Sequence, residues 1–234
     1  MSPVLSVIVP TLNEGAVIES LLRELQPLRQ AGCELIVSDA GSADDTCVLA
    51  GQLADKVVSG TAGRALQMNR GAEAAAGDWL WFVHADTRFQ HPTIEFLELF
   101  RRMSSDWGFF AVRLDADGAS YRLIETLMNI RSRFSRVGTG DQGLFVRREL
   151  FEQLHGFALI PLMEDVELSK RLRRLSAPRF VARPLLTSAR RWQRQGMVHT
   201  ILLMWRLRLA YFLGVSPQRL AKHYRVCSSP THES

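Results

Sequence analysis

Polar and acidic residues follow three predicted strands, at the positions where ligands bind in open α/β proteins. The apolar runs Leu5–Val9, Glu34–Ser38 and Trp79–Val83 are typical of buried strands. The residues that follow them include Pro10, Thr11, Asn13 and Glu14 after the first, Asp39, Gly41 and Ser42 after the second, and His84, Ala85 and Asp86 after the third. Because the carboxyl ends of parallel strands meet at one edge of a sheet, we expect these residues to line one crevice.

Two aspartates in this set suggest a nucleotide and a metal. Asp39 can accept hydrogen bonds from a nucleoside. Asp86 could hold Mg²⁺ or Mn²⁺ while a diphosphate completes the coordination shell, with His84 as a second ligand. Each residue also has a purely structural interpretation: Asp39 and Ser42 could cap the next helix, Asp86 could be an ordinary loop aspartate, and His84 could be a packed side chain.

Two further positions could contribute charge. Arg64, at the start of a predicted helix, could pair with a phosphate or be an ordinary solvated residue. Glu164 and Asp165 begin a helix after the helix breaker Pro161, where backbone N–H groups favour negative charge. Asp165 could act as a general base if it reaches an acceptor hydroxyl, although helix capping explains both acids without any chemistry.

The elements that must position these residues alternate along the chain, which indicates an α/β fold with a mostly parallel, Rossmann-like central sheet flanked by helices. Further strands are expected at Lys56–Ser59, Phe109–Leu114, Leu144–Arg147, Arg179–Ala182 and Leu185–Ser188. Helices are expected around Val17–Leu25, from a capping box of Ser42 and Asp45 to Leu53, and at Arg64–Ala76, Pro92–Met103, Arg122–Phe134 and Glu164–Arg174. Mixed strand directions are expected in the second half.

Composition limits the classes of protein. With 234 residues and 47% apolar residues, one domain of residues 1–189 is expected, with a donor half to about 115 and an acceptor half after it. A helical appendage at 190–227 and a disordered tail at 228–234 would follow. The net charge of +5 comes mainly from arginines in the last third, which suit phosphate or an anionic membrane surface; no nucleic-acid partner is expected.

Cellular location is suggested by two absences in the sequence. The cysteines Cys33, Cys47 and Cys227 show neither disulfide nor metal spacing, which is typical of a reducing compartment. The N-terminus has no signal-peptide pattern, so a cytoplasmic protein is expected.

The chain also lacks the glycine-rich dinucleotide fingerprint and the phosphate loop, which makes NAD and ATP poor candidates as ligands.

The C-terminal segment His199–Leu213 is apolar on nearly every side, with Arg206 and Arg208 as the exceptions. It is shorter than the roughly 20 residues that span a bilayer, and such a helix must be covered. Two coverings remain open: burial against the domain or a homodimer partner, and peripheral insertion into the inner face of a membrane with the arginines reaching the headgroups.

The motifs together resemble the family 2 glycosyltransferases. The resemblance is carried, in order, by Ser6–Glu14, Glu34–Thr46, Asn69–Thr87, Gly143–Arg148, His155–Phe157 and Met163–Leu172, within a likeness from about Val4 to Arg174. It implies a GT-A fold and an inverting hexosyl transfer from a nucleoside-diphosphate sugar, with a UDP-sugar favoured. It also implies a divalent metal, Mg²⁺ or Mn²⁺, and an acceptor that is a small molecule or lipid-linked.

The resemblance also implies roles for individual residues. Asp39 would contact the base, Asp86 would hold the metal and Asp165 would be the general base. The remaining nucleotide-sugar contacts would be Pro10, Thr11, Asn13, Glu14, Gly41, Ser42, Arg64 and Ala85, and the acceptor side would have Gln142, Glu164, Arg191 and Trp192.

The sequence departs from the family pattern in two places. His84-Ala85-Asp86 stands where two aspartates are usual, so metal preference could differ. Arg190-Arg191-Trp192 only vaguely resembles the Q-x-x-R-W motif of processive members, and processive synthesis is not expected. The H-A-D-T motif, the Gly140-Asp141-Gln142-Gly143 loop and the short C-terminus are similar to a small bacterial subgroup associated with arsenosugar biosynthesis. A sugar-phosphate nucleotidyltransferase and a non-catalytic nucleotide-sugar-binding module remain the alternatives.

Overall fold

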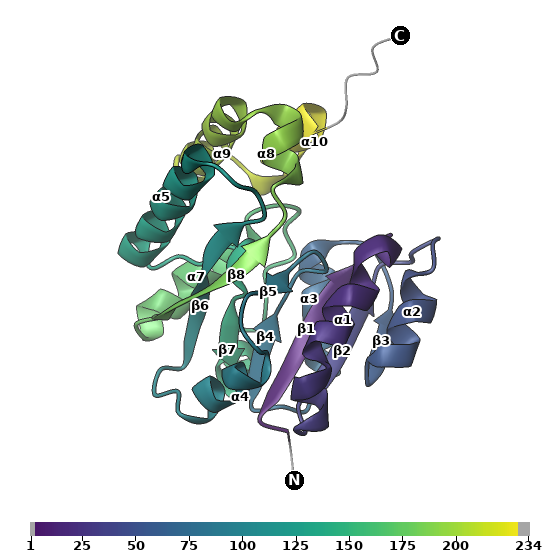
Figure 1. Ribbon diagram of the computed structural model, residues 1–234. Helices are drawn as coiled ribbons and strands as arrows, with labels where there is room; N and C mark the ends of the chain where they lie inside the picture. Colours follow the sequence, from purple (N-terminus) through teal and green to yellow (C-terminus); the bar gives the residue numbers. More distant parts are fainter. Residues whose placement is uncertain (1–2, 229–234) are drawn as a thin grey trace.

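The computed structural model describes residues 3–228, and its first half is built from parallel strands joined by helices (Figure 1). β1 (Leu5–Thr11), β2 (Glu34–Asp39), β3 (Lys56–Ser59) and β4 (Trp79–Phe82) alternate with α1 (Gly15–Gln30), α2 (Thr46–Leu53) and α3 (Arg64–Glu73). β1 pairs in parallel with β2 and β4, and β2 with β3. β2 and β4 are buried along their whole length, as their apolar runs predicted.

The second half extends the sheet with mixed strand directions, as expected. The elements are β5 (Arg88–Phe89), α4 (Ile94–Arg101), β6 (Trp107–Leu114), α5 (Ala119–Ser135), the 3₁₀ turn η1 (Gly140–Gln142), β7 (Phe145–Arg147), α6 (Arg148–Gln153), α7 (Glu164–Leu175) and β8 (Arg179–Thr187). β7 runs antiparallel to β4 and β6, and β6 runs parallel to β8. The sheet order is β3-β2-β1-β4-β7-β6-β8-β5.

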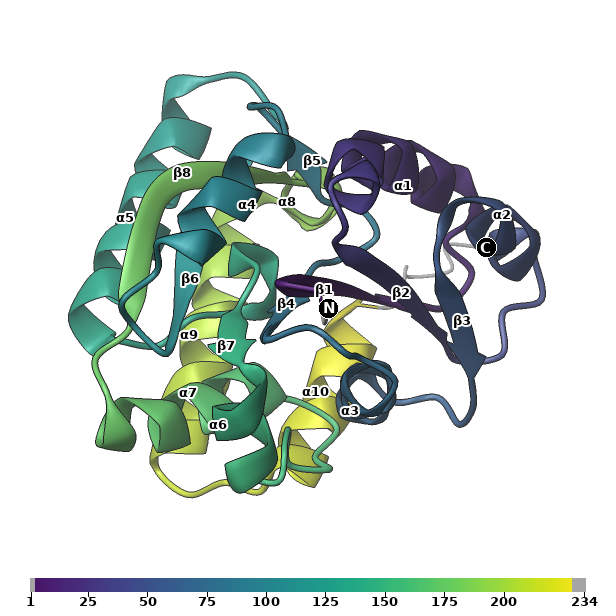
Figure 2. The same ribbon diagram turned by 90° about the horizontal axis from the view of Figure 1, so that it is seen from below.

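Two apolar cores cover the two faces of this sheet. One packs α1, α2 and α4 against side chains such as Val7 and Trp81, and the other packs α3, α6 and α7 against Ile8 and Phe82. Figure 2 shows these helices on opposite sides of the strands. The fold is therefore a curled α/β sheet with helices on both faces, and the carboxyl ends of β1, β2 and β4 lie at one edge.

Three C-terminal helices, α8 (Arg190–Gln195), α9 (Met197–Phe212) and α10 (Pro217–Ser228), lie beside α5 and the start of α7 (Figure 1). Leu203 and Leu207 of α9 pack with Met163 and Val166, and Ile201 packs near Ile124 of α5. The other side of α9 remains exposed, so this helix is covered on one face only. No helix in the described part of the chain is long and apolar enough to cross a membrane.

Several predicted boundaries need correction. Ser42 and Asp45 form no capping box: α2 begins at Thr46, whose N–H donates to Asp44 Oδ1 at 3.1 Å, and the Ser42 hydroxyl donates to Asp39 at 2.5 Å. The two strands expected after Arg179 are one strand, β8, whose pairing with β6 shifts register at a bulge. The short β5 was not expected. Ser228, assigned to a disordered tail, ends α10, and the rest of that predicted tail, 229–234, lies outside the described residues.

Candidate active site

Asp39 forms a hydrogen-bonded turn after β2. Its buried carboxylate accepts bonds from the N–H groups of Gly41 and Ser42, both at 2.8 Å, and from the hydroxyls of Ser42 and Thr11 at 2.5 and 2.9 Å. Burial alone would raise the pKa of Asp39, but these hydrogen bonds outweigh it and lower the pKa to about 2. Gly41 makes the turn at a φ of 83°, which favours glycine.

The loops after β1 and β2 are joined by backbone-to-side-chain bonds. The N–H of Asn13 donates to Ser42 Oγ at 2.8 Å, and Asn13 Oδ1 accepts from the Ala43 N–H at 2.9 Å. The N–H of Glu14 donates to Thr46 Oγ1 at 2.8 Å. Pro10, half-buried, precedes this pair of loops at the end of β1. These bonds hold residues 12–14 and 40–46 together as one surface beside the edge of the sheet, which we call the ledge.

A concentration of carboxylates surrounds the turn after β4. Burial raises the pKa of Asp86, and the nearby charge of Asp141 raises it further, while Arg64 and Arg88 oppose the shift. Burial and the charge of Asp86 likewise raise the pKa of Glu14. Ala85 is buried beside Asp86. Such crowded negative charge favours a cation in this place.

The side chains near Asp86 could supply only part of the coordination shell of a divalent metal. Within residues 3–228 no group of three or more His, Cys, Asp or Glu side chains could hold a metal by itself. Asp86, with Asp141 nearby, supplies the oxygen ligands that Mg²⁺ and Mn²⁺ prefer, and such ions commonly complete their shell with substrate phosphates and water. The residues fit a metal that binds together with a diphosphate.

His84 contacts Arg64. The guanidinium Nη2 lies against His84 Nε2, and Arg64 Nε pairs with Glu164 Oε1 at 3.2 Å. Burial lowers the pKa of His84 well below 6.5, and the charge of Arg64 adds to this effect, so the imidazole is neutral. In this structure His84 Nε2 faces the Arg64 cation, and the expected role of His84 as a metal ligand stays a prediction.

Asp165 lies at the N-terminus of α7, where its carboxylate accepts bonds from the N–H groups of Gly140 and Val166, both at 2.7 Å. Burial raises its pKa, Arg64 and the two N–H groups oppose the shift, and Asp141 adds to it. Burial and the charge of Asp165 also raise the pKa of Glu164. A raised pKa brings a carboxylate closer to the range useful for proton transfer.

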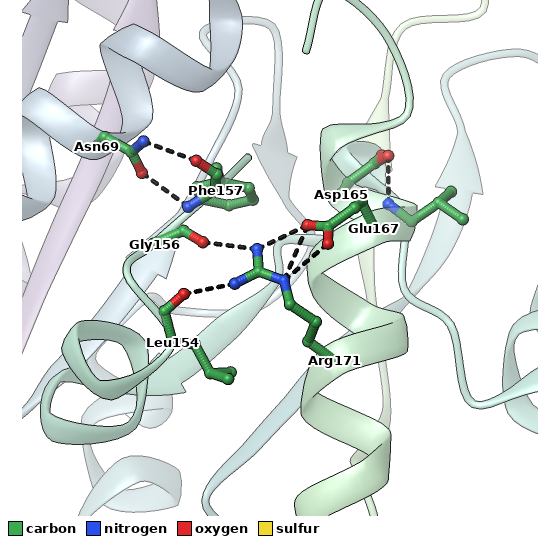
Figure 3. Close-up of polar contacts among 8 residues, drawn as sticks. Asn69, Leu154, Gly156, Phe157, Asp165, Glu167 and Arg171 are labelled. Atoms are coloured by element: carbon green, nitrogen blue, oxygen red, sulfur yellow. Dashed lines mark hydrogen bonds and ion pairs between the residues drawn. The ribbon is translucent and has the colours of Figure 1, made fainter. Parts of the chain in front are cut away.

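The loop before α7 is anchored from two sides, which fixes Asp165 (Figure 3). Arg171 pairs with Glu167 at 2.6 Å and donates to the carbonyls of Leu154 and Gly156. The Asn69 side chain of α3 bonds both the N–H and the carbonyl of Phe157 at 2.9 Å. The loop before Asp165 is therefore joined to α3 in the first half of the chain.

A cavity of about 470 Å³ is lined by only part of the predicted site. The predicted nucleotide-sugar contacts that do not line it are Pro10, Thr11, Asn13, Glu14, Asp39, Gly41, Ser42 and Ala85. The predicted site residues that line it are Arg64, His84, Asp86, Glu164, Asp165 and Trp192. Gln142, predicted on the acceptor side, is instead fully buried, where its amide accepts from Ser132 at 2.8 Å and from Thr139; its contacts hold the turn η1. Arg191 lies in α8, and its side chain is outside the described part of the structure.

The cavity residues that the sequence did not predict include Asp141, Arg131 and Arg190. Asp141 lies in the turn η1, where only its neighbour Gln142 was assigned a role. Arg131 is an ordinary arginine in the helical pattern of α5, and no sequence signal distinguishes it. Arg190 was considered only as part of an approximate motif.

Residues 6–159 match the family described as glycosyl transferase family 2, and the chain belongs to this family. It is 34% identical over 92 residues to a PGL/p-HBAD biosynthesis glycosyltransferase of Mycobacterium bovis, a match that covers 36% of each chain. It is 36% identical over 98 residues to glucosyl-3-phosphoglycerate synthase of Mycobacterium tuberculosis, covering 38% of this chain and 30% of the relative. The chain thus spans about a third of the length of these relatives.

Solved structures share the fold. A mannosyltransferase from Pyrobaculum calidifontis, in complex with GDP-Man and Mn²⁺, matches 90% of this chain and 61% of its own with a TM-score of 0.63 and 21% identity. TarS of S. aureus in complex with UDP-GlcNAc covers 79% of this chain and 58% of its own with a TM-score of 0.64 and 19% identity. Glucosyl-3-phosphoglycerate synthase covers 92% and 80% at 24% identity and a TM-score of 0.60. The fold is that of the GT-A glycosyltransferases.

Proposed function

We propose that this protein transfers a sugar, with inversion, from a nucleoside-diphosphate sugar to an acceptor hydroxyl. The observation that carries the proposal is one cavity in which Asp165, of raised pKa, lies with Asp86 and Arg64. Family membership supports it, as do relatives of the same fold whose structures contain UDP-GlcNAc or GDP-Man with Mn²⁺. A UDP-sugar is the favoured donor.

In the proposed step the acceptor oxygen attacks the anomeric carbon while the bond to the diphosphate breaks. The acceptor proton passes to the ionised carboxylate of Asp165, and the nucleoside diphosphate leaves with the bonding electrons. A single displacement inverts the configuration at that carbon. Gly140 and Val166 orient the carboxylate by their N–H groups, so that it is held in place for the transfer.

The leaving diphosphate needs positive charge. A bound Mg²⁺ or Mn²⁺ would neutralise it electrostatically, and Asp86, with Asp141 nearby, would hold that ion. Arg64 lies in the same cavity and can contribute a second cation, and the neutral His84 and Glu164 hold its guanidinium. We therefore assign His84 to positioning Arg64 and leave Asp86 as the proposed metal ligand.

The nucleoside is assigned to the ledge formed by the loops after β1 and β2. Pro10 and Thr11 come from the end of β1, Asn13 and Glu14 from the loop after it, and Gly41 and Ser42 from the loop after β2. Asp39 already accepts four hydrogen bonds from the protein, so its main contribution is to fix the ledge, with a base contact through a remaining lone pair. Trp192 and Arg191 are proposed on the acceptor side.

Location and subgroup are further parts of the proposal. Cys33 and Cys47 are free, which supports a cytoplasmic protein. The proposed assignment to the subgroup associated with arsenosugar biosynthesis rests on sequence motifs, chiefly His84-Ala85-Asp86-Thr87 and the loop Gly140-Asp141-Gln142-Gly143.

A donor screen tests the proposed function. Thermal unfolding is measured with UDP-, GDP- and TDP-sugars, with and without Mn²⁺, because a ligand that binds only the native state raises Tm. The donor that raises Tm is then incubated with protein and Mn²⁺, and slow release of the nucleoside diphosphate is expected. Turnover that requires pyrophosphate would indicate a nucleotidyltransferase, and binding without any release would indicate a non-catalytic module.

A further inference from the structure

The cavity has two chemically different ends. Its polar end contains Asp86, Asp141 and Asp165. Its other end runs between α5 and α9, where the lining includes Ile124, Leu127, Met128, Ile201, Met204 and Trp205. A sugar or another polar acceptor would gain nothing from this apolar wall, whereas burying an apolar chain there is favourable in proportion to the area covered.

The apolar end opens at the surface, because Leu127 and Trp205 line the cavity and are also 52% and 70% exposed. Each belongs to an exposed apolar stripe at helical spacing. We call these residues together the α5–α9 surface: Leu123, Leu127, Ile130 and Phe134 of α5, with Leu202, Trp205, Leu209 and Phe212 of α9. Exposed apolar surface of this extent marks an interaction site.

The basic residues around the α5–α9 surface indicate what kind of partner it binds. Residues 190–228 contain eight Arg or Lys and no Asp or Glu. The acid of α5, Glu125, is buried and pairs with Arg122 at 3.2 Å, and Arg133 is exposed on the same helix. A second copy of the chain related by a two-fold axis would bring these basic segments together. An anionic membrane surface complements them instead, with the apolar side chains inserted among the lipids.

Arg131 indicates that the ligand of the cavity is negatively charged. It lines the cavity, and its Nε is buried with no hydrogen-bond partner among the described residues. Its Nη2 donates to Ser132 Oγ at 2.7 Å, and Asp141 and Asp165 lie near enough to attract its charge without forming an ion pair with it. A buried N–H without an acceptor is costly, and a phosphate oxygen in the cavity would satisfy the Nε–H of Arg131.

We infer that the acceptor is an anionic, hydroxyl-bearing lipid drawn from a membrane surface, with its apolar chain between α5 and α9, its phosphate at Arg131 and its hydroxyl at Asp165. This inference rests on the proposed transferase activity. It specifies the acceptor class of that same cavity and the side from which the acceptor enters.

Membrane binding is tested by co-sedimentation with phosphatidylcholine vesicles, pure or containing phosphatidylglycerol. The wild type is expected to bind the anionic vesicles and to lose binding in high salt. Trp205→Glu and Leu127→Glu, at exposed positions, should weaken binding at least tenfold. Val48→Glu, at an exposed apolar position of α2 outside the α5–α9 surface, is the matched control and should bind as the wild type does. No binding by the wild type, or a stable dimer that Trp205→Glu dissociates, would overturn the inference.

Binding inside the cavity is tested with lysophosphatidylglycerol below its micelle concentration, measured by calorimetry. One molecule is expected to bind, more tightly than lysophosphatidylcholine. Arg131→Gln should weaken this binding about tenfold and Arg131→Lys less, because lysine keeps a cation; circular dichroism checks that both variants fold. Equal affinity for the two lipids, or an unchanged Arg131→Gln, would contradict the anion site.

The acceptor inference and the transferase proposal fail in different ways. If the wild type releases no nucleoside diphosphate from any donor, the transferase proposal fails. If it hydrolyses the donor but phosphatidylglycerol vesicles do not accelerate release and no glycolipid forms, only the acceptor inference fails. Acceleration with a new glycolipid product supports both.

Discussion

The two sides of the site satisfy their charged groups differently. At the turn after β2, Asp39 accepts hydrogen bonds from Thr11, Gly41 and Ser42, and its pKa falls to about 2. In the cavity at the start of α7, burial raises the pKa of Asp165, and the buried Nε of Arg131 has no hydrogen-bond partner among the described residues. A charged group whose hydrogen bonds are all made within the protein stabilises the fold. A charged group that is buried with incomplete hydrogen bonding is available to bind a ligand or to exchange a proton.

The largest expected effect follows from removing the base. Asp165→Asn keeps the shape and an acceptor oxygen but cannot take a proton, so kcat should fall by about 10²–10⁴-fold with donor affinity nearly unchanged. Steady-state transfer and donor titration measure the two quantities. Glu149→Gln changes an exposed acid in the first turn of α6 and should leave both unchanged. Near-wild-type transfer by Asp165→Asn would return this residue to a capping role.

A smaller effect is expected at the metal position. Asp86→Ala should remove the tightening of nucleoside-diphosphate binding that Mn²⁺ produces, a loss of about 10–100-fold, because it deletes the proposed oxygen ligand. Asp39→Ala should weaken nucleoside-diphosphate binding to a similar degree with and without metal. Calorimetry at several Mn²⁺ concentrations distinguishes them, and an Asp86→Ala variant with unchanged metal dependence would exclude this residue from the site.

The pH profile of turnover should report the environment of Asp165. Burial raises its pKa, so protonation should inactivate the base at a higher pH than for an ordinary aspartate, and kcat should rise with pH through that value. The charge of Arg64 opposes this shift. Arg64→Gln should therefore move the acidic limb of the kcat profile to still higher pH, and a limb that stays in place or moves down would contradict the electrostatic assignment.

The smallest effect concerns stability on the donor side. Asp39 has a folded pKa of about 2 against an ordinary value of 3.8, so its carboxylate contributes stability above pH 3.8 that is lost as pH falls toward 2. Asp39→Asn should lower the free energy of unfolding by on the order of 2 kcal/mol at pH 7. Urea titrations at pH 7 and pH 3 should show the difference shrinking in acid.

Local patterns predicted the α/β alternation and the edge where the site lies. The runs before Pro10, Asp39 and His84 are short, apolar and β-branched or aromatic, and such runs are strongly specified when both faces are buried. Because ligands of open α/β sheets bind beyond the carboxyl ends of the strands, Asp86 was expected in the crevice. Asp165 became a candidate through its position at a helix start and through the family resemblance. The structure brings both residues to one cavity.

What the sequence could not provide depends on tertiary packing. Asp141 and Arg131 enter the cavity through the placement of η1 and α5, and nothing in their local sequence separates them from ordinary loop or helix residues. The apolar pattern of α9 indicated a covered helix, but which face meets α7 is decided by the partners Met163 and Val166. The capping prediction for Ser42 was wrong because Asp39 offers its hydroxyl a closer partner.

The central claim is that Asp39 mainly stabilises the fold whereas Asp165 takes the proton in the reaction, and one paired measurement tests it. The free energy of unfolding and kcat are determined for Asp39→Asn and Asp165→Asn under the same conditions at pH 7. Asp39→Asn should lose stability. Asp165→Asn gives up one of its two N–H···O bonds but also removes a buried charge of raised pKa, so it should lose less stability than Asp39→Asn, yet lose about 10²–10⁴-fold in kcat. A loss of stability in Asp165→Asn as large as in Asp39→Asn, with turnover retained, would contradict the account.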